Sequence, residues 1–150
     1  MRHSTGLIAV LLFFFAGTAH AQAKPEDAIK YRRAVYRVLL WNWMPLNAMA
    51  RGRVAFDAAA FAKGAERVAS LSTQLLEGFP AGSQTGAPTD AKPEIWTRYA
   101  DFSAKMKSFE TEAAKLASTA KGGNEVATKA QFGKVAGTCK ACHDKYKLDD

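Results

Sequence analysis

The sequence Cys139-Lys140-Ala141-Cys142-His143, close to the C-terminus, decides how the rest of the chain is interpreted. Residues three and four positions apart share one face of a helix, so Cys139, Cys142 and His143 would point the same way. Two cysteines at this spacing, followed directly by a histidine, are the signature of covalent haem attachment. The thiols form thioether bonds to the two haem vinyl groups, and the histidine supplies an imidazole nitrogen to the iron. The motif therefore predicts one covalently bound haem c with His143 as the axial iron ligand.

Two cysteines this close together also fit other kinds of site. A redox disulfide of this spacing belongs in a strand–helix–strand unit, and the sequence has no strand pattern. A structural zinc site needs four ligands, whereas Cys139, Cys142 and His143 supply three. The chain has 2 cysteines, both inside the motif, and no second cluster of cysteine and histidine completes a zinc site. Covalent haem attachment is the interpretation that uses every residue of the motif.

The first 21 residues have the three parts of a secretory signal peptide. Residues 1–3 include a positive charge, residues 7–15 are apolar, and residues 19–21 form an A-x-A cleavage site. The apolar run is too short to span a bilayer, so we expect cleavage after Ala21 and no membrane anchor. The mature haem domain would then be residues 22–150. Because c-type haem is attached outside the cytoplasm in bacteria, we expect a periplasmic location.

Removal of the signal changes both the histidine content and the charge. Two of the 3 histidines lie in residues 1–21, which leaves His143 alone and excludes a second histidine ligand from the same chain. Cleavage removes one of the 21 Lys and Arg residues and none of the 14 Asp and Glu residues. The remaining net charge of about +6 favours acidic redox partners, or simply solubility, in an exported protein. We expect no binding to nucleic acid.

Four stretches of the mature chain have apolar residues at alternating spacings of three and four, which is typical of helices in a bundle. They cover residues 25–50, 57–78, 93–120 and 124–146. Their predicted core seams, in chain order, are Ile29, Arg32, Tyr36, Leu39, Trp43 and Leu46; Phe61, Gly64, Val68, Leu71 and Leu75; Ile95, Tyr99, Phe102, Met106, Phe109, Ala113 and Leu116; and Phe132, Val135, Cys139, Cys142 and Tyr146. Residues 78–92 are rich in Gly, Pro, Ser and Thr and predict a long surface loop. We expect an all-α, antiparallel four-helix bundle that holds haem near one end.

The sequence resembles the cytochrome c′ family in four segments. These are residues 23–32 (AKPEDAIKYR), 56–59 (FDAA), 92–96 (KPEIW) and 139–146 (CKACHDKY). The C-terminal position of the haem motif is the most specific part of the resemblance, which covers nearly the whole mature chain. The resemblance implies an antiparallel four-helix bundle, often a homodimer packed through its first two helices. It also implies a five-coordinate, high-spin haem that binds nitric oxide and carbon monoxide, with nitric oxide buffering and electron transfer as the roles.

The resemblance implies roles for two residues of the first predicted helix. Arg32 matches the family arginine that pairs with a haem propionate, and an arginine on an apolar seam itself calls for an anion. The alternative is a surface arginine whose stem lies along the edge of the core. Tyr36 matches the position on the distal face, where many relatives have leucine and low-spin relatives have methionine. An uncharged phenol is a poor iron ligand, and the alternative for Tyr36 is a seam aromatic whose hydroxyl bonds elsewhere.

Two positions depart from the family pattern. Lys147 stands where arginine is frequent near the proximal pocket, which keeps the charge but loses the planar guanidinium group. Arg33 stands where glutamine is common. Any role of the family arginine at the proximal pocket is therefore not carried over to Lys147.

Other functions remain open beside gas binding. A low-spin electron carrier would need a methionine ligand from Met44, Met49 or Met106, each of which also suits packing in a seam. A weak peroxidase-like enzyme would need a distal acid–base residue, and the mature chain has no second histidine, so we expect no enzyme activity. Val38 and Trp41 lie beside the main seam of the first helix and are candidates for a dimer interface.

Overall fold

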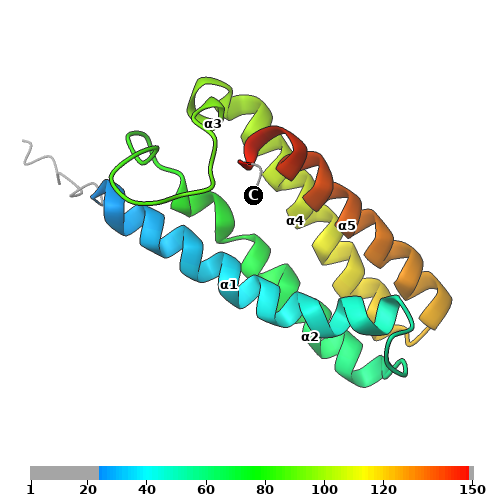
Figure 1. The fold of residues 1–150 in the computed structure, drawn as a ribbon. Coiled ribbons are helices and arrows are strands. Elements are labelled where there is room, and N and C mark those ends of the chain that lie inside the picture. The colour runs from blue at the N-terminus through cyan, green and yellow to red at the C-terminus, as the bar shows by residue number, and fades with distance from the viewer. Residues whose placement is uncertain (1–23, 149–150) are drawn as a thin grey trace, which may run out of the picture.

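The computed structural model describes residues 24–148, in which four long helices form an antiparallel bundle (Figure 1). The long helices are α1 (Pro25–Ala50), α2 (Ala58–Ser72), α4 (Tyr99–Lys121) and α5 (Glu125–Tyr146). Two short elements, η1 (Leu75–Gly78) and α3 (Glu94–Thr97), flank the loop between α2 and α4. Within the described residues the only strand-like pairing is an isolated bridge between Ala91 and Lys147. The predicted all-α four-helix bundle is confirmed, and the predicted signal peptide, residues 1–21, lies outside the described residues.

Local sequence explains where the helices begin. Pro25 occupies the first turn of α1, where its missing amide proton costs nothing. Asp57 caps α2 by accepting a hydrogen bond from the backbone amide of Ala60, at 2.9 Å. Asn124 caps α5 in the same way by accepting from the amide of Ala127, also at 2.9 Å. These caps satisfy amides that have no partner inside the helix.

Two of the predicted helices are interrupted. The segment expected as one helix over residues 57–78 is α2 followed by the short 3-10 helix η1. The segment expected over residues 93–120 breaks at Arg98, whose backbone angles of φ −124° and ψ 37° are not helical. The break shifts the helical register, so Tyr99 of the predicted seam is 40% exposed. The rest of that seam, from Ile95 to Leu116, is buried as predicted.

The two ends of the bundle differ in how α1 meets α5. At one end the rings of Trp43 and Phe132 stack with centroids 4.1 Å apart. Phe61 meets Phe132 edge to face at 6.1 Å, and Phe56 lies against Phe61. We call this cluster of Trp43, Phe56, Phe61 and Phe132 the aromatic end. Toward the other end, residues 32–43 of α1 and the last turns of α5 form opposite walls of a cavity, which Trp43 also borders, and we call this the cavity end.

The bundle has no helix among residues 24–148 that is both long and apolar enough to cross a membrane. The longest helix, α1, spans 26 residues but carries charged side chains along its length.

Candidate haem-binding site

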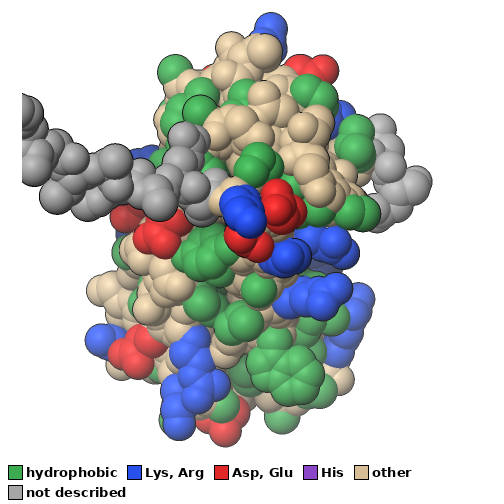
Figure 2. Space-filling view, turned by 90° about the vertical axis from the view of Figure 1, so that its left-hand side faces the viewer, with side chains coloured by type: hydrophobic (Ala, Val, Ile, Leu, Met, Phe, Trp, Pro, Cys, Tyr) green, Lys and Arg blue, Asp and Glu red, His purple; other side chains and the backbone are tan. Residues whose placement is uncertain are grey.

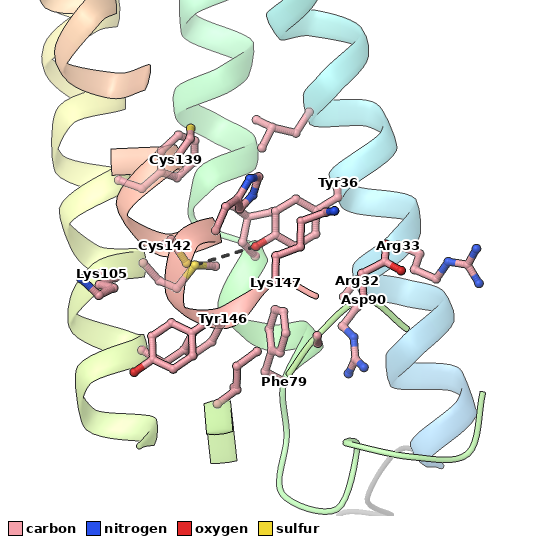
Figure 3. Close-up of a pocket in the computed structure, with 18 of the residues that line it drawn as sticks. Arg32, Arg33, Tyr36, Phe79, Asp90, Lys105, Cys139, Cys142, Tyr146 and Lys147 are labelled. Atoms are coloured by element: carbon pink, nitrogen blue, oxygen red, sulfur yellow. Dashed lines mark hydrogen bonds between the residues drawn. The ribbon is translucent and has the colours of Figure 1, made fainter. Parts of the chain in front are cut away.

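A cavity of about 570 Å³ lies at the cavity end and has α1 on one side and α5 on the other (Figure 3). Helix α4 and the loop after η1 complete its walls. Its lining is mostly apolar, and it includes the five residues of the predicted haem site, Arg32, Tyr36, Cys139, Cys142 and His143. Every residue predicted as part of the haem site therefore lines this one cavity.

The two cysteines lie on the wall formed by α5. Cys139 and Cys142 are one turn apart, partly buried, and not joined in a disulfide. Burial, and then the neighbouring Cys142, raise the pKa of Cys139 to about 11. Burial also raises the pKa of Cys142. Both are therefore neutral thiols at pH 7. Among residues 24–148, no three His, Cys, Asp or Glu side chains gather in a group that could hold a metal ion.

His143 follows Cys142 on the same helix and faces the same cavity. Its side chain is exposed, but desolvation by surrounding protein atoms lowers its pKa, and the charge of Lys147 lowers it further. A neutral imidazole has a free nitrogen lone pair, which is the form that binds a metal. The three residues of the motif thus present two thiols and one ligand nitrogen to the same space.

Arg32 is buried on the opposite wall, with 3% of its surface exposed. Its Nη1 donates to the backbone oxygens of Gly78 and Ser83, at 3.2 and 2.9 Å, and its Nη2 donates to Thr89 Oγ1 at 2.8 Å. The guanidinium also lies over the ring of Phe79, 5.0 Å from its centroid. Burial lowers the pKa of Arg32, yet an arginine stays charged in proteins. The alternative of a surface arginine is therefore excluded.

The acceptors around Arg32 are all neutral, so its charge has no anionic partner among them. A buried charge without a counter-ion is costly, and a carboxylate delivered into the cavity would remove that cost. Haem carries two propionates, so this buried cation fits the group that the cysteine motif predicts. The fit rests on the chain's own residues: two thiols, an imidazole and an unpaired buried cation around one cavity.

Sequence reasoning did not find the residues that hold Arg32 in place. Gly78 was expected only as a helix stop, but a Cβ there would lie 2.4 Å from Cβ of Arg32. Only glycine lets η1 approach α1 this closely. Ser83 and Thr89 come from a loop whose sequence predicts turns but no contact. No local pattern reveals these contacts, because they join segments 46 to 57 positions apart.

The same loop connects the two walls of the cavity. Residues 89–92, which we call the strap, receive the Arg32 hydrogen bond at Thr89 on the α1 side. On the α5 side the amide of Leu148 donates to the oxygen of Asp90 at 2.8 Å, and the amide of Lys92 donates to the oxygen of Tyr146 at 2.9 Å. The strap therefore links α1 to the end of α5, just beyond the haem motif.

Tyr36 extends from α1 toward the cysteine-bearing turns of α5 (Figure 3). Its hydroxyl donates to Sδ of Met106 on α4, at 3.9 Å, which is a weak contact. Burial is the main cause that raises the pKa of Tyr36, followed by the cysteines. The phenol therefore stays neutral at pH 7. Of the candidate methionine ligands, Met106 lines the cavity, whereas Met44 is 52% exposed and Met49 accepts from the amide of Asp57 near the aromatic end.

Comparisons with known proteins identify relatives of this chain by sequence and by fold. The cytochrome C′ family model matches residues 27–147. Cytochrome c′ of Rubrivivax gelatinosus is 37% identical over 124 residues, which cover 83% of this chain and 96% of the relative. Cytochrome c′ of Shewanella frigidimarina superimposes with a TM-score of 0.82 at 42% identity, over 85% of this chain and 99% of that one.

A further solved structure is a nitric oxide complex of a mutant cytochrome c′ from Alcaligenes xylosoxidans. It has a TM-score of 0.79 at 34% identity and covers 86% of this chain and 99% of that one. The resemblance in the sequence is thereby confirmed over the fold as well as the motif. The chain belongs to the cytochrome c′ family, and its cofactor is haem c, bound covalently through Cys139 and Cys142.

Proposed function

We propose that this chain is a periplasmic gas-binding cytochrome whose iron has His143 as its only protein ligand. Arg32 pairs with a haem propionate, and Tyr36 covers the distal face. Nitric oxide and carbon monoxide bind on that face, and the protein also exchanges electrons with a partner. The observation that carries the proposal is the placement of His143 and Tyr36 in one cavity, the first on α5 and the second on α1.

The chain's own residues explain why one face would lack a protein ligand. Residues 22–150 contain no histidine besides His143. Tyr36, at the distal position, is a neutral phenol and therefore a weak ligand. When bound, the haem would supply an iron with a coordination position that a diatomic gas can occupy. The proposal includes no enzyme activity, because the mature chain has no second imidazole to move protons at the iron.

Tyr36 is proposed to act as a lid on the distal face. An incoming gas must displace a ring that is packed in the cavity wall, and the lost contacts weaken binding. The hydroxyl has one weak acceptor, the sulfur of Met106, so packing rather than hydrogen bonding holds the ring. The competing role is that of a hydrogen-bond donor to the bound gas.

The optical and spin-resonance spectra of the ferric protein at pH 7 test the proposal. We expect a predominantly high-spin iron. A low-spin, six-coordinate spectrum would contradict it and would support the second candidate, a low-spin electron carrier, which is favoured by the position of Met106 in the cavity wall. In that case Met106→Leu would convert the spectrum to high spin, and Met44→Leu, at an exposed position, would serve as the control.

A homodimer is part of the proposal. Val38 is 50% exposed and Trp41 is 81% exposed on α1, and large apolar surface of this kind favours association. Sedimentation at micromolar concentration should show a dimer that Trp41→Glu dissociates. A single species of monomer mass for the unaltered protein would contradict the proposed homodimer.

Two further observations support the other parts of the proposal. The nitric oxide complex of the Alcaligenes xylosoxidans relative supports gas binding, and the sequence of residues 1–21 supports export.

A further inference from the structure

The charged residues around the cavity are mostly basic. Those that line it, besides His143, are Arg32, Arg33, Arg37, Asp90, Lys105 and Lys147. Arg32 is buried, so the outer positions carry four cations and one carboxylate. Figure 3 shows Arg33 on the α1 side, Lys105 on the α4 side and Lys147 between them. The entrance to the haem cavity is therefore surrounded by positive charge from three helical regions.

Three cations on the rim, Arg33, Arg37 and Lys105, take no part in the ion pairs that some lysines elsewhere on the surface make. Seven ion pairs connect lysines to carboxylates in the described chain, and none of them uses Arg33, Arg37 or Lys105. Arg33 donates only to a neutral oxygen, that of Pro88, at 3.3 Å. The charges of these three side chains are thus available to an acidic partner, whereas seven lysines elsewhere are paired with carboxylates.

Apolar side chains lie beside these arginines on α1. Arg33, Arg37, Leu40 and Met44 follow one another at spacings of four, three and four, which places them on one flank of the helix. Leu40 is 56% exposed and Met44 is 52% exposed. The end of the molecule that holds the α1 N-terminus shows Lys and Arg side chains gathered beside exposed hydrophobic ones (Figure 2). An apolar patch with a charged edge is the usual composition of a transient protein interface.

This flank is centred on a different side of α1 from the one proposed for the dimer. Val38 lies about 160° from Leu40 at 100° per residue, and Trp41 lies about 100° from Leu40, next to Arg37. A second copy placed at the basic flank would bring like charges together, which opposes association. The two flanks therefore suit different partners, and an acidic one fits the flank with arginines.

We propose that the surface formed by Arg33, Arg37, Leu40, Met44, Lys105 and Lys147 docks an acidic one-electron redox protein. This inference rests on the electron exchange in the proposed function and names the partner's chemistry and its landing place. One electron passes between the two proteins at the cavity entrance, so one is oxidised and the other reduced by the same electron. Complementary charge acts mainly by speeding encounter and by selecting the partner.

Small redox ions of opposite charge test the surface on the haem-loaded protein. Ferricyanide, an anion, accepts one electron from the ferrous protein and becomes ferrocyanide, while tris(phenanthroline)cobalt(III), a cation, does the same with the opposite charge. We expect the ferricyanide rate to fall as ionic strength rises and the cobalt rate to rise. Arg37→Glu should lower the ferricyanide rate about fivefold at low ionic strength and raise the cobalt rate.

Lys63→Glu is the matched control, because it makes the same charge change on an exposed position of α2 outside the cavity. If Arg37→Glu and Lys63→Glu have equal effects, the surface does not guide redox partners and the inference is wrong. Carbon monoxide affinity, measured on the same variants, reports separately on the haem site, so a failed gas-binding proposal is distinguishable. Cosedimentation with phosphatidylglycerol vesicles that Arg37→Glu abolishes, with unchanged ferricyanide kinetics, would also overturn the assignment to a redox protein.

Discussion

At the aromatic end, α1 and α5 are in direct contact through the stacked rings of Trp43 and Phe132, whereas at the cavity end a strap of residues 89–92 joins the same two helices. The first contact is apolar and makes no use of the chain's charges. The second depends on hydrogen bonds and on a buried arginine. The comparison indicates that one end supplies packing stability, which lets the other end keep two helices apart around a cavity.

Removal of the two thiols should have the largest effect, and this effect should be confined to the cavity end. The double variant Cys139→Ala/Cys142→Ala should contain no covalent haem, so acid-acetone extraction should leave the exported protein colourless. Hydrogen exchange should then quicken at the amides of Lys92 and Leu148, which connect the strap to the end of α5, because haem no longer supports the cavity walls, while the aromatic end stays protected. Lys140→Ala, inside the motif but exposed, should keep its haem. Haem retained by the double variant would refute thioether attachment.

The second-largest effect should come from a substitution at the aromatic end, and it should lower the stability of the protein. Phe132→Ala removes a ring that is 4% exposed and contacts both Trp43 and Phe61. It should lower the free energy of unfolding by about 3–5 kcal/mol, as measured by urea denaturation, and leave carbon monoxide affinity nearly unchanged. Val126→Ala on the same helix, where the side chain is 80% exposed, should cost less than about 0.5 kcal/mol. A large change in gas affinity for Phe132→Ala would show that the two ends are not separate.

A smaller effect should follow from loosening the strap. Thr89→Val keeps the shape of the side chain but removes the acceptor for Arg32 and for the amide of Ala91. We expect a loss of about 1–2 kcal/mol in the free energy of unfolding, with faster exchange of the Lys92 and Leu148 amides. Thr85→Val, at an exposed position of the same loop, is the control. Equal exchange rates in the two variants would show that Thr89 does not couple the strap to α1.

The smallest effect concerns the link between α4 and the end of α5. Asp101 accepts hydrogen bonds from Lys145 and from the hydroxyl of Tyr146, and these lower its pKa, Lys145 being the larger cause. A carboxylate whose pKa is lower in the folded state stabilises the protein above its unfolded pKa of about 3.9, and the contribution is lost as pH falls through the folded pKa. Asp101→Asn should therefore lower Tm slightly at pH 7, by about 1–2 °C, and the difference should shrink toward pH 3. A difference that grows on acidification would contradict this sign.

The sequence alone predicted the parts of the molecule that depend on local pattern. Alternating spacings of three and four identified the four helices and most of their buried faces, because a helix repeats every 3.6 residues. The spacing of the haem motif predicted that Cys139, Cys142 and His143 share one face of a helix, because positions i, i+3 and i+4 do so. The structure places all three in the lining of one cavity. The charge of Arg32 within an apolar seam indicated an anion, and the structure buries that side chain next to the cavity.

The rest of the site depends on contacts between distant segments. The close approach of Gly78 to Arg32, and the strap that crosses from Thr89 to Lys92, have no signature in the residues that make them. No proline or glycine stands at Arg98 to indicate the break. The third helix was therefore predicted to be continuous, with Tyr99 in the core. Such features follow from how the helices pack, which a single sequence does not display.

The central claim is that the cavity end has a distal face guarded by the packed ring of Tyr36, and carbon monoxide binding tests it most directly. Affinity should be measured for the ferrous unaltered protein, Tyr36→Phe and Tyr36→Ala, with Tyr31→Ala on an exposed position of the same helix as the control. Tyr36→Ala should bind on the order of tenfold more tightly because the obstacle is gone, Tyr36→Phe should change little, and the control should match the unaltered protein. Weaker binding in Tyr36→Phe would make the phenol a hydrogen-bond donor instead, and an unchanged affinity in Tyr36→Ala would contradict the claim that Tyr36 guards the site.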